Sequence, residues 1–195
     1  MIRTKEDLRL YMEADKRMLE REGARPGPVD YVWKFERLLR RSEYWHNRPK
    51  TPLTVFFGKF LSLRLARMEA RLGFSIPLNV FGSGLSIAHV GPIVVSPYAR
   101  IGRNCRIHVG VNIGTRAGVP DEAPTIGDDV YIGPGAKLFG RIEVADRIAV
   151  GANAVVNKSF GNPGISIGGV PAKKISDKGN PDYKGNPDYK GGKPE

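Results

Sequence analysis

The sequence has a single cysteine, Cys105, and no long uninterrupted apolar run. One cysteine excludes an intrachain disulfide, and nothing else in the composition argues for an oxidising compartment. Residues 1–7 lack the apolar stretch of a signal peptide, and the most apolar segment, residues 53–66, is interrupted by Lys59 and Arg64. We therefore predict a protein of the reducing cytoplasm without an integral membrane segment.

Acidic residues are scarce relative to basic ones, with 20 against 31 and a formal net charge of +11. Such an excess favours polyanions in general, including nucleic acid, phosphate-bearing cofactors and acidic membranes. It is concentrated in residues 1–73, which carry 17 basic and 10 acidic side chains. No nucleic-acid recognition motif accompanies it, and solvated helix faces account equally well for a group of arginines there. These are Arg37, Arg40, Arg41, Arg64, Arg67 and Arg71. We predict no nucleic-acid partner.

What the sequence does contain is a six-residue period of branched aliphatic residues. Its members are Val95, Ile101, Ile107 and Ile113, and then Ile126, Ile132, Leu138, Val144, Val150 and Val156. A period of six does not fit an α-helix and is too regular for a set of hairpins. It predicts an all-β solenoid, a parallel β-helix with three hexapeptides per coil. Cys105 occupies one of the small inward positions, where a packed thiol would be inert.

The period divides the chain into three regions. Residues 1–73 show helical spacing of apolar residues, which predicts one helix to about Glu22, a second from about Val29 that ends before Asn47, and a third that ends at Gly73. Residues 74–175 form the predicted β-helix. Residues 176–195 repeat Gly-Asn-Pro-Asp-Tyr-Lys and have little to bury, which predicts a disordered, low-complexity tail.

The six-residue period breaks once, between Ile113 and Ile126. Insertions in repeat solenoids form surface loops, often on the binding face. We therefore expect the inserted residues 115–124 to contact the substrate.

Two histidines, His89 and His108, lie in the repeat region, nineteen positions apart. Because one coil takes about eighteen residues, we expect them on neighbouring coils near one edge. His89 stands six residues before Val95, where the period predicts an aliphatic residue. It either fills an irregular first coil or acts as a general base. His108 replaces a glycine, so it should point outward near a corner, and a structural role is its simpler interpretation.

The order of the motifs resembles that of the left-handed β-helix acyltransferases and, within them, the serine O-acetyltransferases with their helical N-terminal region. The motifs are His89-Val90-Gly91-Pro92, Ile132-Gly133-Pro134-Gly135-Ala136, Gly151-Ala152-Asn153 and Gly169-Val170-Pro171-Ala172-Lys173. The resemblance covers about residues 75–175. It implies a homotrimer that transfers acetyl directly from acetyl-CoA to a small-molecule hydroxyl acceptor.

The resemblance also assigns roles to individual residues. His89 matches the general base, and His108 is its possible neighbour or a group that orients the substrate. The acetyl-CoA would lie in a groove between prisms of the trimer. Its pantetheine path matches Gly133, Pro134, Ala136 and Ala152, and the basic positions near its phosphates match Lys158 and Lys173. Corner geometry alone also explains the glycine and alanine positions. No cluster of metal ligands is present, so no metal is predicted.

The acceptor stays open between serine and a sugar hydroxyl. The serine enzymes carry an acidic residue where this chain has Ala88 and an Arg-His pair where it has Glu122-Ala123, and their aspartate partner of the base falls on Phe74 or Ser75. These departures favour a sugar hydroxyl, for example in surface polysaccharide assembly. One alternative is a non-catalytic trimeric scaffold. A carbonic-anhydrase-like zinc site would need three converging histidines, and His46 lies outside the repeat.

Overall fold

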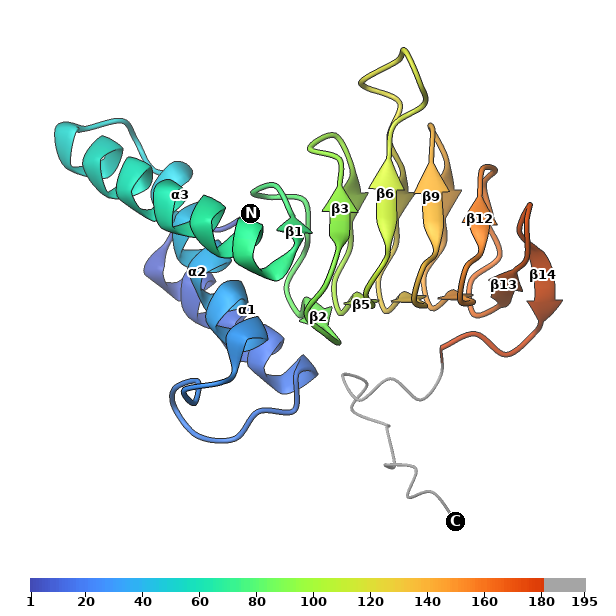
Figure 1. Ribbon diagram of the computed structural model, residues 1–195, viewed down its shortest axis with the longest axis horizontal. Helices are drawn as coiled ribbons and strands as arrows, with labels where there is room; N and C mark the ends of the chain where they lie inside the picture. Colours follow the sequence, from blue (N-terminus) through green and yellow to red (C-terminus); the bar gives the residue numbers. More distant parts are fainter. Residues whose placement is uncertain (181–195) are drawn as a thin grey trace.

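Three helices stand at one end of the molecule. The computed structural model describes residues 1–180, and the helices are α1 (Lys5–Met18), α2 (Tyr31–His46) and α3 (Pro52–Leu72). Figure 1 shows them grouped beside the first strands, with the remaining strands stacked away from them. The side chains of Thr4 and Thr51 cap α1 and α3 by accepting from the backbone N–H three residues on. Gly73, at φ 77°, ends α3 in the left-handed conformation that favours glycine.

The second and third helices end where the sequence predicts, whereas α1 ends earlier. Its last residue is Met18 rather than Glu22, because the chain turns at Glu20, which takes a positive φ of 55°. The predicted start of the second helix is also early by two residues, since the side chain of Asp30 caps the helix by accepting from the N–H of Trp33.

The strands are short and follow α3 in a continuous series. They are β1 (Phe74–Ser75), β2 (Ser86–Ile87), β3 (Ile93–Val95), β4 (Arg100–Ile101), β5 (Arg106–Ile107), β6 (Asn112–Gly114), β7 (Thr125–Ile126), β8 (Tyr131–Ile132), β9 (Lys137–Phe139), β10 (Glu143–Val144), β11 (Ala149–Val150), β12 (Val155–Val156), β13 (Ser166–Gly168) and β14 (Lys173–Ser176). They form three sheets: sheet A, ordered β1-β3-β6-β9-β12; sheet B, β10-β7-β4; and sheet C, β14-β13-β11-β8-β5-β2.

The pairing of these strands shows how the chain winds. From β2 to β12, successive strands pass through sheets C, A and B in turn, and strands three apart in the chain pair in parallel. All ten aliphatic residues of the six-residue period are at most 5% exposed, so they form the core between the sheets. The predicted stacking of parallel coils with an inward aliphatic period is therefore confirmed.

The first coil departs from the period, and this corrects the prediction for His89. Ile87, not His89, takes the inward position before Val95: it is buried and pairs with Ile107 of the next coil. Eight residues separate Ile87 from Val95, whereas six separate Ile107 from Ile113. The two extra residues widen this corner, and His89 lies exposed on it.

The last strands of the coil end close to residue 175, the predicted limit of the β-helix. β13 continues sheet C, and β14 turns back to pair with it in antiparallel fashion. The backbone N–H of Asn180 donates to the carbonyl of Arg147 at 3.0 Å. The predicted disorder is therefore wrong for residues 176–180, while residues 181–195 lie outside the described part. Within residues 1–180, no helix is long and apolar enough to cross a membrane.

A buried ionic network joins the helices to the first coil. The guanidinium of Arg40 donates to Asp15 at 2.7 Å, to Glu43 at 3.0 Å and to the carbonyls of Phe81 and Gly82 at 3.1 and 2.6 Å. All three charged side chains are at most 2% exposed. Burial acts to lower the pKa of Arg40, but the two carboxylates raise it above its ordinary value, so the guanidinium stays charged. The interpretation of Arg40 as part of a solvated helix face is thus wrong.

We expect the substitution Arg40→Met to lower the free energy of unfolding by about 3–5 kcal/mol, because it leaves two buried carboxylates without their cation. Urea denaturation followed by circular dichroism measures the loss. Arg41→Met, at the exposed neighbouring position, is the matched control and should change stability by less than about 0.5 kcal/mol. Equal stability of the two variants would contradict this role of the network.

Glu36 provides a second test, through pH. Its side chain is fully buried, and burial followed by the charge of Asp15 raises its pKa well above the ordinary value. The folded state therefore holds this proton more tightly than the unfolded chain does. Stability from this group is present at low pH and is lost as pH rises through the folded-state pKa. We expect Glu36→Gln to remove that loss, which thermal unfolding at a series of pH values would reveal as a flatter profile than that of the wild type.

Candidate functional site

Most of the predicted site residues lie along one edge of the coil, where the chain passes from sheet C to sheet A. His89 follows β2, His108 follows β5, Gly133 and Pro134 follow β8, and Ala152 follows β11. These four strands are neighbours in sheet C, with Ile87, Ile107, Ile132 and Val150 paired in register. The corners after them therefore stack on one another. We call this line of corners, residues 88–92, 108–111, 133–136 and 151–154, the histidine edge.

The two histidines are neighbours on this edge. Their ring centroids are 6.0 Å apart, which confirms the prediction that they sit together on adjacent coils. Within residues 1–180, the exposed imidazole of His89 makes no hydrogen bond. His108 is half-buried rather than pointing freely outward, and its Nε2 atom is buried without a hydrogen-bond partner in the described chain. That atom is an unmet polar group beside His89, available to a bound ligand.

Burial lowers the pKa of His108, and the charges of Arg106 and His89 lower it further. The ring is therefore neutral at neutral pH and can donate from one nitrogen and accept at the other. The ring of Tyr131 lies 5.1 Å from that of His108 and extends the line of polar rings. Sequence reasoning missed Tyr131. Its place in the six-residue period could have identified it. Tyr131 directly precedes Ile132, as Arg106 directly precedes Ile107, and Tyr131 and Arg106 are cross-strand partners.

The four small residues of the predicted cofactor path divide into two groups. Pro134 and Ala152 are exposed on the histidine edge, where a ligand can reach them. Ala136 is fully buried, so its methyl group packs in the core. At Gly133, a Cβ atom would lie 2.8 Å from the Val150 carbonyl oxygen and 2.9 Å from the nitrogen of Ala152. Glycine is therefore required there by the stacking of the coils.

The predicted lysines and the inserted loop lie elsewhere. Lys158 follows β12, at the edge where sheet A passes to sheet B, and its Nζ lies 5.5 Å from the centre of the Phe160 ring. Lys173 is exposed on β14. Residues 115–124 leave the coil after β6 and project beyond the other turns (Figure 1). Within one chain, the loop and Lys158 thus lie at the opposite end of the sheet A strands from the histidines.

The positions that depart from the serine enzymes supply no carboxylate to His89. Phe74 is buried, with its ring centroid 4.9 Å from that of Phe35, and Ser75 is exposed. In the loop, Glu122 lies 3.7 Å from the guanidinium of Arg116, and Ala123 is buried. This chain therefore orients its histidine pair without the charged groups that the resemblance would require.

Cys105 is buried in the coil, and burial raises the pKa of its thiol, which keeps it protonated and unreactive. Residues 1–180 contain no group of three or more His, Cys, Asp or Glu placed to hold a metal ion.

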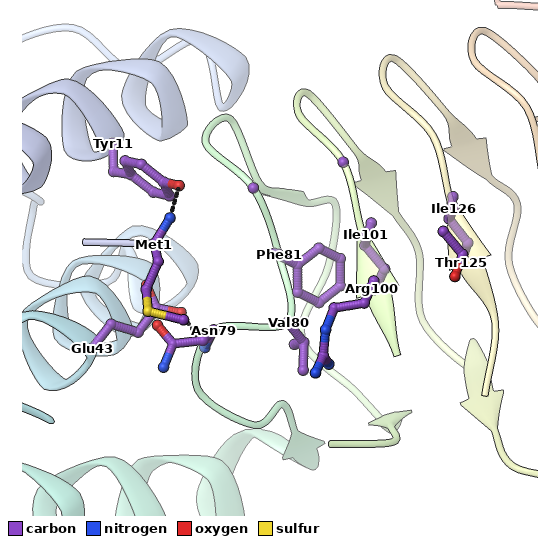
Figure 2. A pocket seen from close by; sticks show the side chains of 12 residues that line it. Met1, Tyr11, Glu43, Asn79, Val80, Phe81, Arg100, Ile101, Thr125 and Ile126 are labelled. Carbon is purple, nitrogen blue, oxygen red and sulfur yellow. Dashed lines mark hydrogen bonds between the residues drawn. The ribbon is translucent and has the colours of Figure 1, made fainter. Parts of the chain in front are cut away.

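A separate cavity of about 350 Å³ lies between the helices and sheet B. Figure 2 shows the amino group of Met1 donating to the hydroxyl of Tyr11, at 2.9 Å, with Arg100 and Thr125 on the strand side. None of the predicted site residues lines it, so it is not part of the histidine edge.

No family model matches the chain. The serine acetyltransferase of Mycobacterium tuberculosis is 37% identical to it over 100 residues, which cover 51% of this chain and 43% of that protein. The solved serine acetyltransferase of Neisseria gonorrhoeae, in complex with serine, is 28% identical with a TM-score of 0.66 and covers 88% of this chain and 70% of its own. The solved serine acetyltransferase of Brucella abortus, in complex with coenzyme A, is 27% identical with a TM-score of 0.66, and the match covers 90% of this chain and 68% of that one.

The chain spans 43 to 58% of the length of the first curated relatives that it matches. The likeness extends over the helices as well as the coil, since the superposed structures cover about nine-tenths of the chain. In sequence and in fold, the chain is therefore serine acetyltransferase-like, as the order of its motifs predicts.

Proposed function

We propose that this chain is an acetyl-CoA-dependent O-acetyltransferase that acts at the histidine edge. The observation that carries the proposal is the exposed His89 beside the half-buried His108, with ring centroids 6.0 Å apart, in a chain that resembles serine acetyltransferases. A left-handed coil, a homotrimer and a cytoplasmic location belong to the same proposal. So does the division into a helical region (1–73), a catalytic coil (74–175) and a C-terminal tail (176–195).

In the proposed reaction His89 is the general base. Its neutral imidazole takes the proton of the acceptor hydroxyl as the oxygen attacks the thioester carbonyl carbon. The new C–O bond forms and the C–S bond breaks, so the acetyl group passes directly to the acceptor. The imidazolium then returns its proton to the departing thiolate, which leaves as the free thiol of coenzyme A. An exposed position suits this role, because both substrates must reach the ring.

His108 is proposed to orient the acceptor. Its lowered pKa keeps it neutral, so its ring can form a hydrogen bond with the acceptor hydroxyl. The buried Nε2 atom without a partner gains a hydrogen bond when a hydroxyl binds beside it. The hydroxyl of the neighbouring Tyr131 is a further group that can position the acceptor.

The acetyl-CoA is proposed to follow the histidine edge in a cleft between two copies. The small, exposed side chains of Pro134 and Ala152 leave room for an extended pantetheine chain to lie against them. Gly133 can contact it only through its backbone, and Ala136 is buried and contributes core packing. Lys158 and Lys173 are exposed and cationic, as phosphate contacts require. A cleft between two copies is lined by residues of both copies. Lys158, which lies on the edge opposite the histidine edge, can therefore contact the acetyl-CoA bound at the histidine edge of a neighbouring copy. The coenzyme A complex of the Brucella abortus relative supports the choice of donor.

The acceptor is proposed to be a small molecule with a free hydroxyl. The Neisseria gonorrhoeae relative in complex with serine supports serine. Serine recognition in the family uses charged partners for the ammonium and carboxylate groups, whereas this chain has Ala88, Phe74 or Ser75, and the pair Glu122-Ala123 at the corresponding positions. These replacements favour an uncharged sugar hydroxyl over serine.

We expect His89→Ala to lower the rate of thiol release from acetyl-CoA by about 10²–10⁴-fold, the usual contribution of a general base. His108→Ala should lower it less and chiefly raise the KM of the acceptor, because His108 positions rather than accepts the proton. Thiol release is measured with L-serine, homoserine, amino sugars and sugar nucleotides in turn.

His46→Ala is the matched control, since His46 is exposed on α2 outside the coil, and it should keep the wild-type rate. Thiol release with a sugar acceptor alone would indicate that the chain acetylates glycan precursors. Thiol release with L-serine alone would indicate that it acetylates serine. If His89→Ala kept the wild-type turnover, the assignment of His89 as general base would be wrong. If the wild type neither released thiol nor bound acetyl-CoA, the non-catalytic trimeric scaffold would be the better interpretation.

A further inference from the structure

A large basic cavity lies between α2 and α3, apart from the residues of the proposed reaction. Its volume is about 1210 Å³. Seven of its lining side chains are cationic: Arg25, Lys34, Arg37, Arg41, Arg64, Arg67 and Arg71. Val90, the residue after His89, also lines it, so the cavity reaches the first corner of the histidine edge. We call it the basic cavity.

Two matching helical faces build this cavity. Lys34, Arg37 and Arg41 follow one another at intervals of three and four residues on α2. Arg64, Arg67 and Arg71 repeat the same intervals on α3. Residues so spaced share one face of a helix, and here the two faces line the same space. Helix packing has thus collected into one cavity the charges that the sequence spreads over residues 25–71.

Among residues 1–180, no acidic side chain lines the basic cavity. In the part of the chain that the structure describes, Arg41, Arg67 and Arg71 form no ion pair, and Lys34 donates to the carbonyl oxygen of Pro28. Burial lowers the pKa of Arg37, and the charges of Arg41 and Arg25 lower it further, while the charge of Glu13 offsets part of this effect. A bound anion would relieve this repulsion.

We propose that the basic cavity binds a diphosphate-bearing ligand. Guanidinium groups pair with phosphate oxygens through two parallel hydrogen bonds, and six of the seven cations here are arginines. The volume exceeds what an inorganic ion fills and suits a ligand that carries the diphosphate as an ester. This proposal does not depend on acetyl transfer, because the cavity and its charges belong to the helices.

The diphosphate can come from a soluble ester or from a lipid. Along α3, exposed apolar side chains lie next to these arginines, with Phe56 at 64%, Phe60 at 49% and Leu63 at 52% exposure, and the guanidinium of Arg64 lies 5.7 Å from the centre of the Phe60 ring. Apolar residues next to cations are the pattern that anionic lipid surfaces attract. The chemistry recognised is the same in either case, so the experiment must separate the two sources.

The first test is calorimetric titration of the full chain with inorganic pyrophosphate. We expect the double variant Arg67→Gln/Arg71→Gln to bind at least tenfold more weakly than the wild type, and the affinity of the wild type to fall as salt rises. The matched control is Arg3→Gln/Arg17→Gln, which removes the same charge from exposed positions outside the cavity and should stay within twofold of the wild type. Unfolding midpoints verify that both variants fold.

The second test is co-sedimentation with phosphatidylcholine vesicles that contain a polyprenyl diphosphate, against phosphatidylcholine alone. A lipid-borne diphosphate would be identified if the wild type sediments with these vesicles, if the cavity variant does not, and if added pyrophosphate releases the wild type. Pyrophosphate binding without sedimentation would identify a soluble ester. The proposal is overturned if millimolar pyrophosphate does not bind, or if the control variant weakens binding as much as the cavity variant does, since net charge alone would then explain it.

Discussion

The buried guanidinium of Arg40 determines how the helices meet the coil. It joins Asp15 of α1 and Glu43 of α2 to the carbonyls of Phe81 and Gly82, and Asp15 also accepts from the N–H groups of the two residues after Ser83. Three desolvated charges are tolerable only because each has several partners. The chain runs from these carbonyls directly into β2 and then to His89, so the position of the first corner depends on this contact. The structure thus links a stabilising network in the helices to the placement of the proposed base.

The first corner of the coil is the second constraint. Its two extra residues displace His89 from the core, while Ile87 keeps the inward position. Gly91 turns this corner at φ 142°, and a Cβ atom there would lie 2.5 Å from Cγ2 of Val109. The same segment therefore packs tightly on the next coil and leaves an imidazole exposed above it. A regular coil would have buried the residue at this point, and the irregularity is what makes a reactive side chain available.

The sequence was sufficient to predict the coil and its core, because every aliphatic residue of the period contributes the same local signal and buries the same way. Gly73 likewise marked the end of the third helix locally. Features that depend on distant partners were not predictable. The burial of Arg40 requires carbonyls some forty residues away, and the exposure of His89 depends on an insertion that the period does not reveal. The basic cavity exists only once α2 and α3 pack, so the same arginines looked like ordinary solvated faces.

The central claim is that the histidine edge is where acetyl transfer takes place. A crystal structure of the protein with bound coenzyme A tests it most directly. The account predicts that the thiol lies beside His89 and His108, with the pantetheine chain along Pro134 and Ala152 in a cleft between two copies. Coenzyme A bound elsewhere, with this edge buried in a contact that admits no ligand, would contradict the account.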